Sequence, residues 1–143
     1  MNRRLMLDGV ESRTFDMRCF RVMAAAGKDA AYEYDVALAG VCDLFERDEA
    51  DIYNLPTDTT FPLYTKIIDW MQDAIKSFNQ KSGGGKLLKG DQMTMLYANL
   101  LRSHGILPDE IDRQDPAWFF AVVTEEHLSE DDIPAEMGMY YGL

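Results

Sequence analysis

Two histidines and two cysteines are the side chains that could supply a base, a nucleophile or a metal ligand near neutral pH. His104 lies near the end of an expected helix, where the helix dipole favours a cation, and His127 lies beside two glutamates. Cys19 and Cys42 lie among apolar residues at helical spacing, which indicates buried, reduced thiols. The four residues show no close pairing of the kind that zinc sites use. We therefore expect no catalytic residue, no metal and no cofactor, and a protein that is not an enzyme.

A glycine run, Gly83-Gly84-Gly85-Lys86, invites comparison with a phosphate-binding loop. It lacks the Ser or Thr that would hold magnesium, because Leu87 follows the lysine, and an expected helix rather than a strand precedes it. The acidic stretches 48–51 and 130–132 lack the glycine and the spacing of a calcium loop. We therefore interpret the glycine run as a flexible linker and the acidic stretches as solvated helix ends.

The composition favours a binding protein. Of the 143 residues, 47% are hydrophobic, which is enough for one compact core or two very small ones, and the formal net charge is -11. This acidity disfavours contact with nucleic-acid phosphates, and the apolar runs are far shorter than the roughly 20 residues of a membrane span. The amino end has no apolar stretch of signal-peptide length. We expect a cytoplasmic protein that binds neither nucleic acid nor membrane.

The first 82 residues predict a helical body behind a short β-hairpin. Asp8-Gly9 suits the two-residue turn of a hairpin over residues 3–14, with Leu7 opposite Val10. Helices are expected over residues 14–27 and about 35–52. A third helix is expected to begin at Pro62, and it has the clearest amphipathic stripe in the chain: Tyr64, Ile67, Ile68, Met71, Ile75 and Phe78.

A glycine-rich linker over residues 83–90 is expected to separate this body from a small acidic helical appendix over residues 91–143. Asp91 and Asp115 precede helical patterns as capping residues, and Gly105 ends the first of these helices. Linker and appendix together hold 11 acidic against 4 basic side chains. The predicted fold class is therefore mainly α: a small helical body with a short N-terminal β-hairpin, a glycine-rich linker and a small C-terminal helical appendix.

The appendix contains a continuous aromatic run, Trp118-Phe119-Phe120, and two tyrosines near its end, Tyr140 and Tyr141. A helix in so small a unit hides only part of its circumference, so some of these rings are expected to face a partner. The same rings would also fill the core of a small helical unit. The same two alternatives apply to part of the stripe in the body, which is either a core face or an adaptable contact face for a partner. The residues concerned are Tyr64, Ile67, Met71 and Ile75.

Residues 96–106 read LYANLLRSHGI and residues 115–120 read DPAWFF. Both segments resemble the downstream part of the tail assembly chaperones of long-tailed bacteriophages, and LMLDG at residues 5–9 resembles their start in phages of Gram-positive hosts. The resemblance implies a non-enzymatic chaperone in the host cytoplasm. Its body would coat the tape-measure protein, with self-association of its copies, and its appendix would recruit tail-tube subunits. The stripe would then contact the tape-measure protein, and the aromatic run the tail-tube protein.

In that family, ribosomal frameshifting commonly gives a short form and a long fused form. The residues Gly84-Gly85-Lys86 permit a slip site, because they can be encoded as G-GGA-AAA or G-GGA-AAG. Lys86 would then be the last residue read in the first frame. The nucleotide sequence at codons 84 to 87 tests this prediction directly.

A second class of function also fits the acidity. A small phage-encoded inhibitor would mimic nucleic acid by presenting clustered carboxylates, and would so block a host protein. Its best segment would be five carboxylates of the appendix: Glu125, Glu126, Glu130, Asp131 and Asp132. The chaperone requires capture of partner proteins, whereas the inhibitor requires displacement of a nucleic acid from a basic protein.

Overall fold

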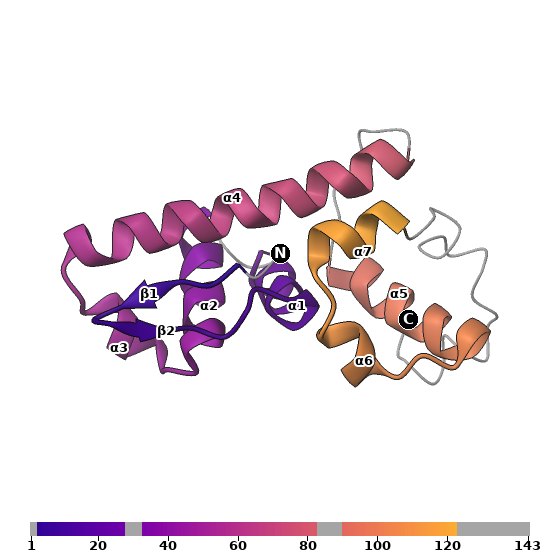
Figure 1. Cartoon of the computed structure of the whole chain (residues 1–143), viewed down its shortest axis with the longest axis horizontal. Helices are drawn as coiled ribbons and strands as arrows, with labels where there is room; N and C mark the ends of the chain where they lie inside the picture. Colours follow the sequence, from indigo (N-terminus) through magenta and orange to yellow (C-terminus); the bar gives the residue numbers. More distant parts are fainter. Residues whose placement is uncertain (1–2, 28–32, 83–89, 123–143) are drawn as a thin grey trace.

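Residues 3–27, 33–82 and 90–122 are described by a computed structural model of the chain (Figure 1). Within these ranges, seven α-helices follow one two-stranded hairpin, which confirms the predicted mainly α fold. The elements are β1 (Met6–Leu7), β2 (Val10–Glu11), α1 (Met17–Ala26), α2 (Glu33–Phe45), α3 (Glu49–Tyr53), α4 (Thr57–Ser82), α5 (Gly90–His104), α6 (Pro108–Asp112) and α7 (Pro116–Val122). None of the described helices has both the length and the apolar character needed to cross a membrane.

The hairpin forms as the sequence predicts. β1 and β2 pair antiparallel with Leu7 opposite Val10. Asp8 and Gly9 form the turn with φ values of 51° and 78°, the left-handed conformation that this turn requires. Leu5 and Leu7 are both buried, so one face of the hairpin is anchored in the core.

The first two predicted helices need correction. α1 is capped by Asp16 rather than Thr14, because an Asp16 carboxylate oxygen accepts a hydrogen bond from the Cys19 amide at 3.0 Å. The helix predicted over residues 35–52 is two helices, α2 and α3. Glu46 adopts a left-handed φ of 54° between them, and a residue in that conformation ends a right-handed helix. The sequence pattern missed this break because no glycine marks it.

The long helix α4 begins at Thr57 rather than at Pro62, so the predicted start is also wrong. The carbonyl of Pro56 accepts hydrogen bonds from the amides of Thr59 and Thr60, at 2.9 and 3.1 Å, and so closes a first turn before Pro62 is reached. Pro62 lies inside the helix, where it lacks an amide donor. The turn-rich appearance of residues 54–60 hid this earlier start.

The helical appendix begins at Gly90, one residue before its predicted start at residue 91. Gly90, the last residue of the predicted linker, is the first residue of α5, and Asp91 therefore lies inside that helix. The rest of the linker, residues 83–89, lies outside the described residues. Gly105 has a φ of 66° directly after α5, and Asp115 accepts a hydrogen bond from the Trp118 amide at 2.9 Å. The predicted stop at Gly105 and the predicted cap at Asp115 are confirmed, whereas the predicted cap at Asp91 is wrong, because the helix begins before it.

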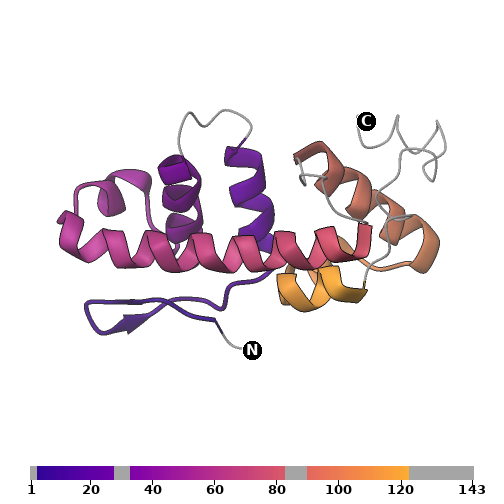
Figure 2. The same cartoon turned by 90° about the horizontal axis from the view of Figure 1, so that it is seen from above.

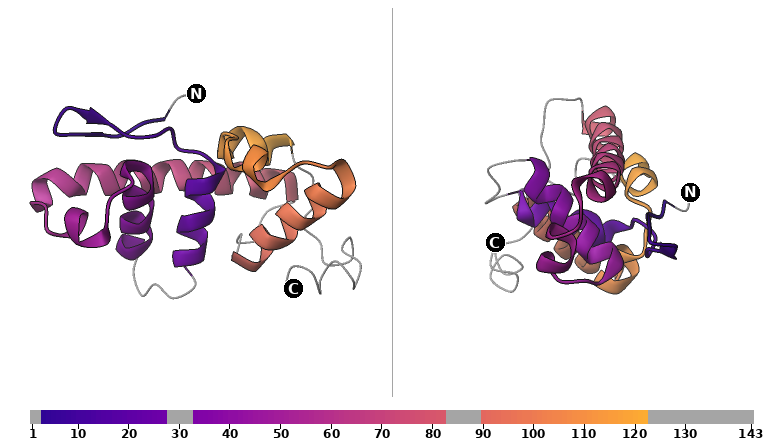
Figure 3. Two further views of the ribbon diagram at one scale, coloured as in Figure 1. Left: turned by 90° about the horizontal axis from the view of Figure 1, so that it is seen from below. Right: turned by 90° about the vertical axis from the view of Figure 1, so that its left-hand side faces the viewer.

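Helix α4 contacts helices of both the body and the appendix. It runs past α2 and α1 and continues beside α7 (Figure 2). The hairpin lies on one side of α4, and α1 and α2 lie on the other (Figure 3). Helices α1, α2 and α4 meet at Gly40 of α2, where a Cβ atom would lie 2.6 Å from both Met23 Sδ of α1 and Ile67 Cδ1 of α4. A residue with a side chain at this crossing would require the Met23 and Ile67 side chains to move.

Body and appendix share one hydrophobic core in this structure. The ring of Phe120 in α7 packs edge-on against Phe20 of α1, with ring centroids 5.1 Å apart, and both rings are fully buried. The Met17 amide at the start of α1 donates to the carbonyl of Gln114, just before α7, at 2.9 Å. Apolar packing and a backbone hydrogen bond therefore both join α1 to the segment around α7.

Candidate protein-binding groove

The aromatic run of α7 is divided between core and surface. Phe119 and Phe120 have exposed fractions of 7% and 0%, whereas Trp118 has 57% of its surface exposed. Successive side chains on an α-helix point about 100° apart, so three consecutive rings cannot share one face. The core interpretation is therefore confirmed for Phe119 and Phe120, whereas contact of Trp118 with a partner stays a prediction. Only Trp118 offers its ring to a partner in this conformation.

A groove lies beside Trp118. Its volume is about 370 Å³, within the range of pockets that hold a ligand or a few side chains. It is walled by α5, α6, α7 and the turn between α5 and α6, and it is lined by Leu100, Ile106, Glu110, Ile111, Gln114, Trp118, Phe119 and Val122. Six of these eight side chains are apolar. The groove is therefore suited to apolar side chains of another molecule.

Local backbone signals position the walls of this groove. Gly105 turns the chain at the end of α5, and the Ile106 amide donates back to the Leu100 carbonyl at 3.3 Å. Pro108 opens α6, in which Ile111 is buried as an anchor. Asp115 then caps α7 through the amide of Trp118. Helix α5 and the two short helices α6 and α7, joined by tight turns, thus form the groove without a long loop.

Two exposed apolar residues near the groove were not predicted as site residues. Leu107 and Val122 are each 53% exposed; Val122 lines the groove, and Leu107 precedes α6. A signal was present in the sequence, because Leu107 stands in a connection between two expected helices, where a core position is unusual. It could not be recognised without knowing which neighbouring residues are buried.

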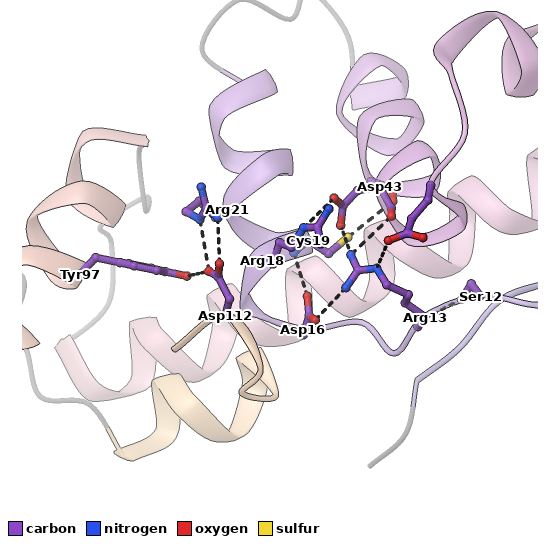
Figure 4. A network of polar contacts seen from close by, with 11 residues as sticks. Ser12, Arg13, Asp16, Arg18, Cys19, Arg21, Asp43, Tyr97 and Asp112 are labelled. Carbon is purple, nitrogen blue, oxygen red and sulfur yellow. Dashed lines mark hydrogen bonds and ion pairs between the residues drawn. The ribbon is translucent and has the colours of Figure 1, made fainter. Parts of the chain in front are cut away.

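A polar cluster ties this region to the body (Figure 4). Asp112 of α6 accepts hydrogen bonds from Arg21 of α1, at 3.0 and 3.4 Å, and from the Tyr97 hydroxyl of α5, at 2.6 Å. Burial and the hydrogen bond to Asp112 raise the pKa of Tyr97, so its hydroxyl stays a donor. Burial alone would lower the pKa of Arg21, but the Asp112 hydrogen bond and charge raise it. One carboxylate therefore joins three helices.

A second polar cluster lies in the body (Figure 4). Arg13, which follows the hairpin, forms ion pairs with Asp16 at 3.1 Å, with Asp43 of α2 and with Glu46 at 3.9 Å, and Arg18 reaches Asp43 at 3.4 Å. Burial raises the pKa of the Asp43 carboxyl despite both arginines, which act in the opposite direction. These pairs join the hairpin exit to α1 and α2, so we interpret the cluster as a structural brace.

The two cysteines are unreactive in their surroundings. Cys19 is buried, its thiol donates to the Gly40 carbonyl at 3.5 Å, and burial raises its pKa well above the ordinary value. Cys42 is half-buried, and burial raises its pKa to about 11. Both are free thiols. A protonated thiol is a poor nucleophile and a poor metal ligand. The prediction of a buried, reduced thiol is confirmed for Cys19, whereas Cys42 is reduced but only partly buried.

The described side chains of the α4 stripe face the core, and the side chain of Phe78 is outside the described part. Tyr64 and Ile67 are buried, Met71 and Ile75 are partly buried against the same core, and the Tyr64 ring packs against Tyr34 of α2 with centroids 4.8 Å apart. These four side chains therefore present little surface to a partner in this conformation. Their predicted binding role requires a rearrangement.

Several predicted positions lie outside the described residues. They are the tyrosines Tyr140 and Tyr141, His127 and the carboxylates of residues 125–132. Among the residues that the structure describes, no three His, Cys, Asp or Glu side chains are grouped as a metal site would require. Comparison of the chain with protein-family models, with curated proteins and with solved structures finds no match.

Proposed function

We propose that this chain is a non-enzymatic tail assembly chaperone of a long-tailed bacteriophage, acting in the host cytoplasm. In this proposal α5 to α7 recruit tail-tube subunits through Trp118 and the groove beside it, and residues 1–82 coat the tape-measure protein. The resemblance of residues 96–106 and 115–120 supports the class of protein. The exposed Trp118 at the rim of an apolar groove is the single observation that carries the position of the site.

Trp118 has the properties of an interface anchor. Its backbone is held by the Asp115 cap and by the buried neighbour Phe119, so little conformational entropy is lost when a partner covers the ring. A tryptophan can bury up to about 250 Å². Covering the exposed part of this ring would remove roughly 100 Å² from water and contribute about 2–3 kcal/mol to binding. Tryptophan is also among the residues most enriched at the energetic centres of interfaces.

The tape-measure contact has two candidate positions on the body. Binding through the stripe of α4 would require α2 or α7 to move away from it, because these helices pack against α4. Among the described residues of the body, five large apolar side chains are exposed and need no rearrangement: Met6, Val10, Tyr34, Tyr53 and Phe61. Copies of the chain that associate side by side along a tape-measure helix would present these residues repeatedly.

Capture of the phage's own tail-tube protein tests the proposal. We expect purified full-length chain to bind it in isothermal titration calorimetry. Trp118→Ala should weaken binding roughly 30- to 160-fold, the equivalent of the 2–3 kcal/mol above. The matched control is Phe61→Ala, which removes a ring that is 64% exposed on the body. It should leave tube binding unchanged. Thermal unfolding of both variants, with each melting temperature within about 4 °C of the parent, shows that the fold is intact.

The outcome that contradicts the proposal is equally specific. A chain that binds neither the tail-tube nor the tape-measure protein, but displaces DNA from a basic host protein, is the acidic inhibitor. The gene offers an independent test, because the frameshift part of the proposal requires G-GGA-AAA or G-GGA-AAG across codons 84 to 86.

A further inference from the structure

The groove beside Trp118 contains one charged side chain, that of Glu110. Glu110 and its neighbour Asp109 are exposed in the first turn of α6. Neither carboxylate forms an ion pair with another residue of the described part of the chain. The groove therefore combines an apolar floor with an exposed carboxylate at its edge that forms no ion pair with a described residue.

We propose that this groove binds one amphipathic α-helix of the partner protein, with apolar side chains one turn apart filling the groove and a lysine or arginine beside them facing Glu110. The inference rests on the proposed function, since this helix would belong to the recruited tail-tube subunit. It adds a chemical description of the recognised segment. It also assigns Glu110 as the residue that favours a basic partner helix over an acidic one.

The volume of the groove can accommodate side chains from one face of a helix. Side chains at positions i and i+4 of a helix lie about 6 Å apart on one face, so two of them can enter a space of about 370 Å³ together. The exposed side chains of Trp118 and Val122 extend the apolar surface beyond the groove itself. An extended peptide would need a free strand edge to pair with. The described residues around the groove are all in helices or turns, so that mode of binding has no template here.

Charge favours a basic helix in this groove over two other occupants, a second copy of the chain and the chain's own residues 123–143. A second copy of the chain has the same net charge of -11, so its approach to an acidic rim is opposed by repulsion. The chain's own residues 123–143 contain six acidic side chains and no lysine or arginine, so they offer no counter-charge to Glu110. A helix with basic residues flanking its apolar face satisfies both requirements of the groove.

Two synthetic helical peptides provide the probe. Each has 16 residues and a leucine face at positions i, i+3, i+4 and i+7; one carries lysines beside this face and the other carries glutamates. Fluorescence anisotropy of the labelled peptides measures their binding to the full chain. We expect the lysine peptide to bind, Trp118→Ala to abolish binding, and Glu110→Lys to weaken binding of the lysine peptide roughly five- to tenfold while strengthening that of the glutamate peptide.

Asp58→Lys is the matched control. Asp58 is an exposed acidic residue in the first turn of α4, and its replacement by lysine changes the net charge by the same amount as Glu110→Lys. It should alter the affinity of either peptide by less than about twofold, as expected for a charge remote from the groove. Equal binding of the two peptides, or an equal effect of Glu110→Lys and Asp58→Lys, overturns the proposal. Circular dichroism of each variant confirms that the helices remain folded.

Other occupants give distinct results. Displacement of the lysine peptide by a synthetic peptide of residues 123–143 would assign the groove to the chain's own C-terminal segment. A dimer that Trp118→Ala dissociates, without binding of either peptide, would assign it to a second copy. Both results overturn the inference. If Trp118→Ala abolishes tail-tube binding but Glu110→Lys leaves it unchanged, the inference fails while the proposed function stands; if the wild-type chain does not bind the tail-tube protein, the proposed function itself fails.

Discussion

Replacing Phe120 by alanine should destabilise the body and the appendix together. Phe120 is fully buried in α7 and its ring packs edge-on against Phe20 of α1. Truncation of a buried phenylalanine costs about 3–5 kcal/mol, which includes roughly 0.5–1.5 kcal/mol for the aromatic pair. For a chain of this length the melting temperature should fall by about 10–15 °C.

The two tryptophans can report on the two parts separately. Trp70 of α4 packs against Phe15, with ring centroids 5.6 Å apart, whereas Trp118 lies on α7. The variant Trp118→Phe therefore leaves a reporter in the body, and Trp70→Phe leaves one in the appendix. Fluorescence-detected urea unfolding of each, with and without Phe120→Ala, gives the midpoint of each part.

We expect both reporters to show one transition in the parent and the same downward shift with Phe120→Ala, because the ring belongs to a core that both parts share. A shift seen by Trp118 alone, with the Trp70 midpoint unchanged, would refute the shared core. Body and appendix would then be independent folding units joined by residues 83–89. A matched change on the surface, Val122→Ala, should change the unfolding free energy that either reporter gives by less than about 0.5 kcal/mol.

Three further predictions concern packing, polar contacts and pH. Gly40→Ala should lower the unfolding free energy by about 1–3 kcal/mol, since its Cβ would lie 2.6 Å from side-chain atoms of α1 and α4. An unchanged melting temperature would show that the Met23 and Ile67 side chains can move aside at no cost. Asp112→Asn removes the charge that pairs with Arg21, and should cost about 1–2 kcal/mol because Arg21 remains partly solvated; a double-mutant cycle with Arg21→Met should show coupling. The pKa of Cys42 is raised to about 11 in the folded chain, so it contributes stability that is complete below its ordinary pKa of 9.0 and is lost as the pH rises through 11. The unfolding free energy should therefore fall between pH 9 and 11, and this fall should be smaller in Cys42→Ala.

Features governed by a few consecutive residues could be predicted from sequence. The hairpin turn at Asp8-Gly9, the end of α5 at Gly105 and the cap of α7 at Asp115 each depend on conformations that only certain residues adopt easily. The break at Glu46 could not be predicted in this way, because a glutamate seldom adopts a positive φ. Packing and hydrogen bonds of the surrounding fold hold it there.

The site itself required the tertiary structure. Trp118, Phe119 and Phe120 are equally apolar neighbours in the sequence, and an amphipathic pattern cannot say which of them faces a core whose other wall is built from α1 and α4. The same limit applies to the stripe residues Tyr64 and Ile67, which only the packing of α2 identifies as core. Backbone conformation is determined largely by local chemistry, which the sequence displays directly. Burial is determined by residues that are distant along the chain, and it is burial that separates a core ring from the one ring left free to bind a partner.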